Sequence, residues 1–219
     1  MNRVRAEAGY TLIEVLIALT VFSIISVGFY QVMVQSVRGS EQSRDVAEIS
    51  EEARAGFNRM LRDIREADSL DAASSTSFQL WVDYDADSAR DYASDEVVVY
   101  TFDESAGTVT LASLDSGGSV QTSATLMDGV ENDASDTDVF RYTSNRLEYD
   151  WSPVDGVTTW EEIDTPQSGV NGIGDRDGTL DVAELSYLSN IIIKFNVQVG
   201  DSQTEFLGEG QLRNRRFSV

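Results

Sequence analysis

The side chains best suited to chemistry in this sequence are carboxylates, and one group of them is spaced like the ligands of a calcium loop. The group lies in the stretch NGIGDRDGTLDVAEL, residues 171–185. If Gly178 takes the sixth position of an EF-hand-type loop, oxygen donors fall at positions 3, 5, 7, 9 and 12, namely Asp175, Asp177, Thr179 (through its carbonyl), Asp181 and Glu184. Because Ca²⁺ prefers hard oxygen ligands around such a turn, the spacing predicts a calcium site. Ile173 at the first position cannot bind the ion, and a solvated acidic turn is the alternative.

A second acidic stretch, DYDADSARDYASD at residues 83–95, fits the same loop less completely. Positions 1, 3, 5 and 9 carry acids, which are Asp83, Asp85, Asp87 and Asp91. Serine replaces both the glycine of the sixth position and the bidentate acid of the twelfth. The stretch therefore predicts a weaker calcium site or, as the alternative, a solvated loop between two strands.

The composition excludes most other metal and catalytic chemistry. The 219 residues include 16 Lys and Arg against 38 Asp and Glu, for a net charge of −22, and they include no His and no Cys. This rules out a Ser-His-Asp triad, a cysteine nucleophile, a disulfide, and zinc, haem or iron–sulfur sites with His or Cys ligands. The negative charge also argues against nucleic-acid binding through phosphate contacts. Carboxylates are too abundant for a pair to mark a glycosidase site, so we expect that the protein is not an enzyme.

An apolar stretch near the N-terminus predicts a membrane-spanning helix. Residues 10–34 (YTLIEVLIALTVFSIISVGFYQVMV) contain one charged side chain, Glu14, and about 20 apolar residues suffice to cross a bilayer. Arg3 and Arg5 precede the stretch and favour a cytoplasmic N-terminus. The sequence therefore predicts a signal anchor that crosses the membrane once, with its N-terminus in the cytoplasm.

Glu14 is the residue that a plain membrane anchor does not explain. An unpaired carboxylate inside the apolar region costs roughly 2.5–3.5 kcal/mol on insertion scales. No Lys or Arg occurs in residues 10–37, so the cation that neutralises Glu14 must come from elsewhere, and another chain is one source.

The run GYTLIEVLIAL, residues 9–19, resembles the class III leader junction of type IV pilins and of type II secretion pseudopilins. The resemblance implies that a prepilin peptidase cuts the single-pass precursor in the inner (cytoplasmic) membrane after Gly9, removes the leader of residues 1–9 and methylates the new N-terminus at Tyr10, where the family usually has Phe. Glu14 is then the fifth residue of the mature chain and neutralises the N-terminal amine of an adjacent subunit in a filament. The resemblance thus supplies the missing cation.

The residues after the apolar stretch predict that the helix continues with one apolar face. Apolar side chains recur at steps of three and four residues, at Val46, Ile49, Ala53, Phe57, Met60, Ile64 and Ala67. We expect a transmembrane and filament-core helix over residues 10–36 and its amphipathic continuation over 37–68, about 85 Å in all. The apolar face is expected to pack on a sheet.

Residues 69–219 show the alternation typical of β-strands. Strands are expected at 78–82, 96–102, 108–114, 191–199 and 205–213, with a hairpin of 138–143 and 146–151, and loops at 113–125 and 132–137. The predicted class is α+β. The resemblance makes it a pilin-like fold, in which a long N-terminal helix packs on a C-terminal, mainly antiparallel β domain with acidic loops.

Two further stretches resemble particular pilin-like proteins. AEISEEARAGFNRMLRDIREA (47–67) is similar to PilW-type minor pilins and to the J-type pseudopilin, and GQLRNRR (210–216) is similar to the ending of such minor pilins. The resemblance implies a minor pilin in the priming or tip complex of a type IV pilus-like filament outside the cytoplasm, with prepilin peptidase and other pilins as partners. A type II secretion pseudopilin is one alternative. A membrane-anchored calcium-binding β domain outside any filament is another.

Overall fold

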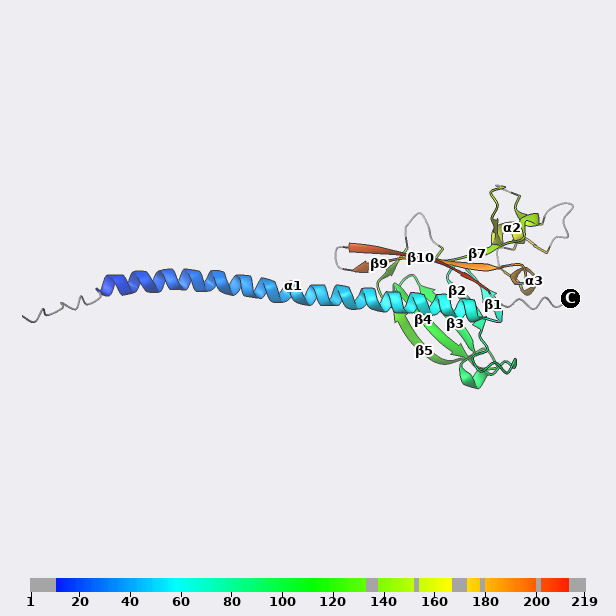
Figure 1. Cartoon of the computed structure of the whole chain (residues 1–219), viewed down its shortest axis with the longest axis horizontal. Coiled ribbons are helices and arrows are strands. Elements are labelled where there is room, and N and C mark those ends of the chain that lie inside the picture. Colours follow the sequence, from blue (N-terminus) through cyan, green and yellow to red (C-terminus); the bar gives the residue numbers. More distant parts are fainter. Residues whose placement is uncertain are drawn as a thin grey trace, which may run out of the picture. The chain divides into compact units, whose positions relative to one another are not determined.

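The computed structural model describes residues 11–132, 138–151, 154–166, 173–177, 180–199 and 202–212 of the chain (Figure 1). The chain divides into two compact units, residues 1–45 and 46–219. One helix, α1 (Leu12–Glu66), contributes to both, and the other elements belong to the second unit. A long N-terminal apolar helix followed by an antiparallel β domain confirms the predicted α+β, pilin-like fold class.

The first part of α1, Leu12–Ser40, is long and apolar enough to cross a membrane, with a mean hydropathy of 2.4 and none of its apolar window buried. Its 29 residues extend about 43 Å at the rise of an α-helix. Thr20 and Ser23 donate their hydroxyl hydrogens to carbonyls of the preceding turn, each at 2.8 Å, so these two groups need no outside partner. Lipid or other helices must cover the remaining apolar surface.

The C-terminal part of α1 carries the apolar face that the sequence predicts. Ala53, Met60 and Ile64 are fully buried, and Phe57 packs against the same core. Arg65 lies in the last turn, where a positive charge interacts favourably with the helix dipole. Burial of this face holds the helix on the β domain.

The first sheet is an antiparallel meander in the order β1-β2-β3-β4-β5. Its strands are β1 (Ser69–Ala73), β2 (Ser77–Trp81), β3 (Val97–Asp103), β4 (Thr108–Leu114) and β5 (Val120–Met127). The predicted loop at 113–125 is therefore wrong over β5. The first six residues of β5 are exposed on both faces because β5 is an edge strand, so its sequence carries no apolar alternation.

The second sheet has the order β10-β9-β7-β8, with β6 pairing with β9. Its strands are β6 (Val130–Glu131), β7 (Phe140–Ser144), β8 (Thr158–Thr159), β9 (Asn190–Val199) and β10 (Ser202–Gln211). The predicted hairpin of 138–143 with 146–151 is wrong, because a 3₁₀ turn, η2 (Leu147–Tyr149), replaces its second strand. Both edges of β7 are already paired, one with β9 and the other with β8.

Besides η2, three short helical segments lie in the described connections between strands. They are η1 (Tyr92–Ser94), α2 (Trp160–Asp164) and α3 (Val182–Leu185). Of the predicted loop at 132–137, only Asn132 is among the described residues. The GQLRNRR stretch is described over residues 210–212, and the rest of it lies outside the described residues.

Aromatic side chains join α1 and the two sheets in one core. Phe78 of β2 stacks on Tyr100 of β3 with ring centroids 4.9 Å apart, and it meets Phe140 of β7 edge-on at 4.7 Å. Phe57 of α1 contacts Phe195 of β9, with 5.8 Å between the ring centroids. These contacts add geometric preference to the apolar area that the core buries.

Two glycines of β10 let α1 lie close to the second sheet. A Cβ atom at Gly208 would lie 2.6 Å from the Phe57 ring, and one at Gly210 would lie 2.5 Å from Cγ2 of Ile64. Because these two positions share one face of the strand, side chains there would push the helix away.

A buried carboxylate fixes the helix against the first sheet. Asp63 of α1 is fully buried and accepts a hydrogen bond from the Tyr100 hydroxyl. Arg62 and Arg59 contribute charge from the helix surface, with Nε atoms 3.3 and 3.7 Å from the Asp63 carboxylate. Burial and the negative charge of Asp63 raise the pKa of Tyr100 well above its usual range, so the phenol stays protonated and remains a donor.

Tyr100→Phe is expected to lower the free energy of unfolding by roughly 2–3 kcal/mol, because it removes a hydrogen bond to a buried charge. Tyr142→Phe is the matched control, since the Tyr142 hydroxyl donates only to the neutral carbonyls of Ser74 and Ser77. Urea unfolding of the full chain in detergent, followed by tryptophan fluorescence, measures both variants. Equal losses in the two variants would show that Asp63 does not anchor the helix.

Candidate functional site

The N-terminal site is described only in part. Gly9 and Tyr10, the predicted cleavage junction, lie outside the described residues. Glu14 lies in the first turn of α1, where its Oε2 accepts hydrogen bonds from the Thr11 amide at 2.8 Å and the Thr11 hydroxyl at 3.1 Å. The Glu14 amide donates in return to Thr11 Oγ1 at 3.3 Å, which completes a capping box. Within one subunit the carboxylate therefore caps its own helix.

The cap leaves the negative charge of Glu14 without a counterion among the described residues. Among the residues that the structure describes, no Lys or Arg forms an ion pair with Glu14. Hydrogen bonds from Thr11 reduce the cost of holding a carboxylate in an apolar segment, but they do not neutralise the charge.

The first acidic stretch contributes two of its five predicted ligands to a cluster. Asp175 and Asp177 lie with Asp164, the last residue of α2, and one carboxylate oxygen from each lies within 4.8 Å of the others. Asp164 was not among the residues predicted from sequence. Thr179 lies outside the described residues, so the structure says nothing of its carbonyl.

The other two predicted ligands form the N-terminal cap of α3. Asp181 Oδ1 accepts hydrogen bonds from the amides of Ala183 and Glu184 at 2.7 and 3.0 Å. Glu184 Oε2 accepts one from the Asp181 amide at 3.1 Å, so the pair is a capping box. The Asp-x-x-Glu spacing that suggested calcium ligands is also the spacing of a helix cap.

Gly174 explains how Asp164 reaches Asp175. A Cβ atom on Gly174 would lie 2.2 Å from the backbone carbonyl groups of both Ile163 and Asp164, a distance that only glycine avoids. The Arg176 amide then donates to the Asp164 carbonyl at 2.8 Å. Gly174 is the sequence signal for a close approach between two backbone segments, but the sequence does not show that the second segment is the one with Ile163 and Asp164.

Glu184 is the described carboxylate with the most clearly perturbed titration. Its side chain is buried, and Oε1 has no hydrogen-bond partner. The pKa of Glu184 is raised to about 7, and burial is the largest cause. The hydrogen bond from the Asp181 amide lowers the pKa, whereas the charges of Asp164, Asp181 and Asp175 raise it. Glu184 thus changes its charge near neutral pH.

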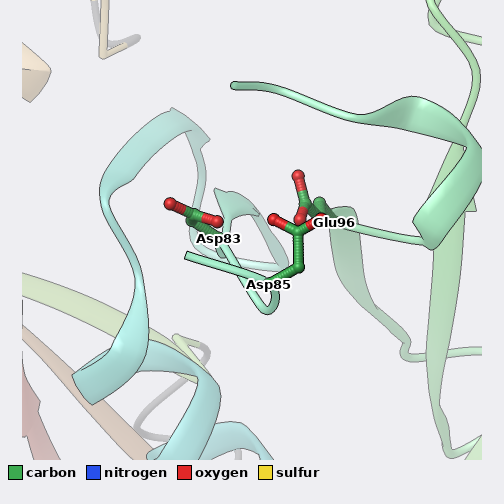
Figure 2. Close-up of side chains that lie close together, drawn as sticks. All are labelled: Asp83, Asp85 and Glu96. Carbon is green, nitrogen blue, oxygen red and sulfur yellow. The ribbon is translucent and has the colours of Figure 1, made fainter. Parts of the chain in front are cut away.

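The second acidic stretch also contributes carboxylates to a cluster, but the members of the cluster differ from the predicted ligands. Asp83 and Asp85, which follow β2, lie with Glu96, which precedes β3, and their carboxylate oxygens approach within 4.8 Å (Figure 2). Asp87 and Asp91 instead accept hydrogen bonds from nearby amides, those of Ala89 at 2.6 Å and Ala93 at 2.8 Å.

Glu96 is not identified from the sequence as a candidate ligand, because this residue is there only the start of the predicted strand at 96–102. Its position has the same parity as Val98, Tyr100 and Phe102, which are the inward-facing residues of β3. This alternation is the signal that could have identified Glu96 as a buried carboxylate beside the acidic loop.

Asp85 senses the charge of this cluster. The largest single influence on its pKa is the hydrogen bond from the Asp87 amide, which lowers it. Burial and the charges of Asp87, Glu96 and Asp83 together outweigh that bond and raise the pKa of Asp85 above its usual value. The carboxylates of the cluster therefore repel one another.

The Glu184 titration predicts a pH dependence of stability. Between pH 4.5, the ordinary value for this group, and pH 7, folded Glu184 keeps a proton that the unfolded chain has lost. Stability from this residue therefore falls as pH rises through that window. Glu184→Gln is expected to match the wild type near pH 4.5 and to exceed it by about 1–3 kcal/mol at pH 8. Urea unfolding with chelator present at both pH values measures the difference. A difference that does not change with pH would contradict the assignment.

Comparison with known proteins bears on the N-terminal site. The family model described as the prokaryotic N-terminal methylation motif matches residues 4–30. No curated protein and no solved structure gives a significant match. The matched segment contains the predicted cleavage junction and Glu14, and it supports a type IV pilin-like or pseudopilin-like prepilin. It points to a structural protein that is processed by a prepilin peptidase and assembles through its N-terminal helix.

Proposed function

We propose that this chain is a minor pilin of a type IV pilus-like filament. Prepilin peptidase would cut the membrane-inserted precursor after Gly9 and methylate Tyr10, and the mature chain would then enter the priming or tip complex. The observation that carries the proposal is the methylation motif at residues 4–30, which overlaps an apolar helix that the described residues leave uncovered. Lipid covers such a helix before assembly, and the helices of other pilins cover it afterwards.

Charge pairing at Glu14 supports assembly over a permanent membrane anchor. Cleavage after Gly9 creates an amine on each mature chain, and the amine of an adjacent subunit is the cation that Glu14 lacks. The capping box with Thr11 holds the Glu14 carboxylate at the start of the helix until that amine arrives. The pairing sets the axial register between neighbouring subunits.

The acidic β domain supports a minor rather than a major role. The leader contains Arg3, Arg5 and Glu7, a net charge of +1, so cleavage changes the total from −22 to −23. Repulsion between mature subunits of that charge opposes dense repetition along a filament. The resemblance of residues 47–67 to PilW-type proteins supports the same role.

A type II secretion pseudopilin shares the leader and the helix, so these features do not separate it from a pilus subunit. The two proposals differ in the assembly that contains the native chain, which is either a pilus or a secretion system. Co-purification with sheared surface pili supports the pilus, whereas retention in the envelope with a secretion assembly supports the pseudopilin. A chain found in neither, anchored alone in the membrane, supports the calcium-binding β domain outside any filament.

Substitutions of Glu14 separate its charge from its capping role. Glu14→Ala and Glu14→Gln are both expected to be processed normally and to enter filaments at least tenfold less than the wild type, because each lacks the charge. Glutamine can still complete the capping box with Thr11, so it tests the charge alone. Thr20→Ala is the matched control, since Thr20 bonds only to its own helix and its loss should not affect assembly.

Immunoblots of filament fractions against membrane fractions measure the incorporation of each variant. Normal incorporation of Glu14→Gln would show that capping suffices and would contradict charge pairing between subunits.

A further inference from the structure

The connection between β2 and β3 ends at a buried carboxylate, one oxygen of which has no hydrogen-bond partner among the described residues. Glu96 is completely buried. Its Oε2 accepts hydrogen bonds from the Asp91 amide at 2.9 Å and from Trp81 Nε1 at 3.5 Å, whereas Oε1 accepts none. A buried carboxylate oxygen without a partner is destabilising unless a cation or a proton occupies the space beside it.

Two more carboxylates share that space. Figure 2 shows Asp83 and Asp85 on the segment that leaves β2, with the Glu96 carboxylate beside that of Asp85. One oxygen from each residue lies within 4.8 Å of the other two. Oxygens bound to one Ca²⁺ at 2.3–2.6 Å can be at most about 5 Å apart, so the three side chains fit around one ion.

No positive side chain neutralises the group. Among the described residues, none of the three carboxylates forms an ion pair with Lys or Arg. Arg90, in the same loop, is instead bound to Asp71 at 3.1 Å and lies over the Trp81 ring, 5.0 Å from its centroid.

Backbone amides hold two of the carboxylates in place. Asp83 accepts hydrogen bonds from the amides of Asp87 and Ser88 at 3.2 and 2.9 Å, and Asp85 accepts one from Asp87 at 3.1 Å. These bonds fix the side-chain directions before any ion binds, which reduces the entropy lost on binding.

We infer that Asp83, Asp85 and Glu96 form a calcium site that closes the β2–β3 connection onto the first sheet. The donors are all hard oxygens, and the chain contains no His or Cys that would favour a softer metal. Glu96 is the buried ligand contributed by the sheet, and Asp83 and Asp85 are the ligands contributed by the loop. Asp87 and Asp91 are not ligands, so the site does not follow the EF-hand order. The inference does not depend on whether the chain enters a filament.

Trp81 provides a direct optical test, because its indole donates to Glu96. The full chain in detergent, freed of metal with chelator, is titrated with Tb³⁺, which replaces Ca²⁺ and emits when a nearby tryptophan is excited. We expect sensitised emission that Ca²⁺ displaces, and a calcium-dependent rise in melting temperature with half-saturation at roughly 10⁻⁴–10⁻³ M. Trp81→Phe should lose most of the emission and keep the calcium-dependent rise. Excitation at the long-wavelength edge of the tryptophan band, where Tyr84 does not absorb, makes the test selective for Trp81, and emission that then survives in Trp81→Phe would place the ion elsewhere and overturn the inference.

Substitutions then identify the ligands. Glu96→Gln and Asp85→Asn should each weaken calcium binding at least tenfold by calorimetry. With chelator present, Glu96→Gln should melt no lower than the wild type, because it removes the buried carboxylate oxygen that has no partner, while an amide oxygen still accepts from the Asp91 amide and Trp81. Asp115→Asn makes the same charge change in the β4–β5 turn and should bind calcium like the wild type.

Two outcomes of this series would overturn the site. In the first, Asp175→Asn abolishes calcium binding, whereas Glu96→Gln and Asp85→Asn leave it unchanged. The ion would then lie at the cluster that contains Asp164. The other is a Glu96→Gln variant that melts lower by the same amount with and without calcium, which would make Glu96 a purely structural residue.

Discussion

The apolar helix with a single carboxylate is the constraint on which the rest of this chain depends. Leu12–Ser40 buries none of its apolar window in its own chain, so its stable surroundings must be lipid or other helices. Glu14 satisfies its hydrogen-bonding capacity partly through Thr11, but its charge has no counterion among the described residues. In the proposed filament, adjacent subunits would supply both the apolar neighbours and the amine, which resolves both problems together.

The β domain solves a different problem, which is how to hold the end of the same helix firmly. Glycines 208 and 210 bring β10 against α1, and the buried Asp63 binds Tyr100 of β3. Both sheets therefore contact the helix through specific geometry as well as apolar area. Outside this core, the acidic connections carry charge that the domain does not neutralise, and Asp83, Asp85 and Glu96 show it most clearly.

The helix was predictable because composition and the 3.6-residue period both mark it, and β2, β3, β4, β9 and β10 followed from apolar alternation. β5 was not, because an edge strand exposed on both faces has no such alternation. Of the acidic clusters, the sequence identified the members that are close along the chain. Asp164 comes from a distant segment, and its approach depends on the Gly174 crossing. Glu96 directly follows the acidic stretch, but its place in the cluster depends on the inward side of β3. Short-range spacing also could not distinguish a ligand pair from the capping box of Asp181 and Glu184.

We propose that this chain is a prepilin whose processing creates the partner of Glu14. The most direct measurement is the mass of the N-terminal peptide of the native protein, isolated from cells with an active prepilin peptidase. If prepilin peptidase processes the precursor, the native chain begins at Tyr10 with a methylated amine. A mature chain that still begins at Met1 would contradict the proposal, because no new amine would then exist for Glu14 to pair with.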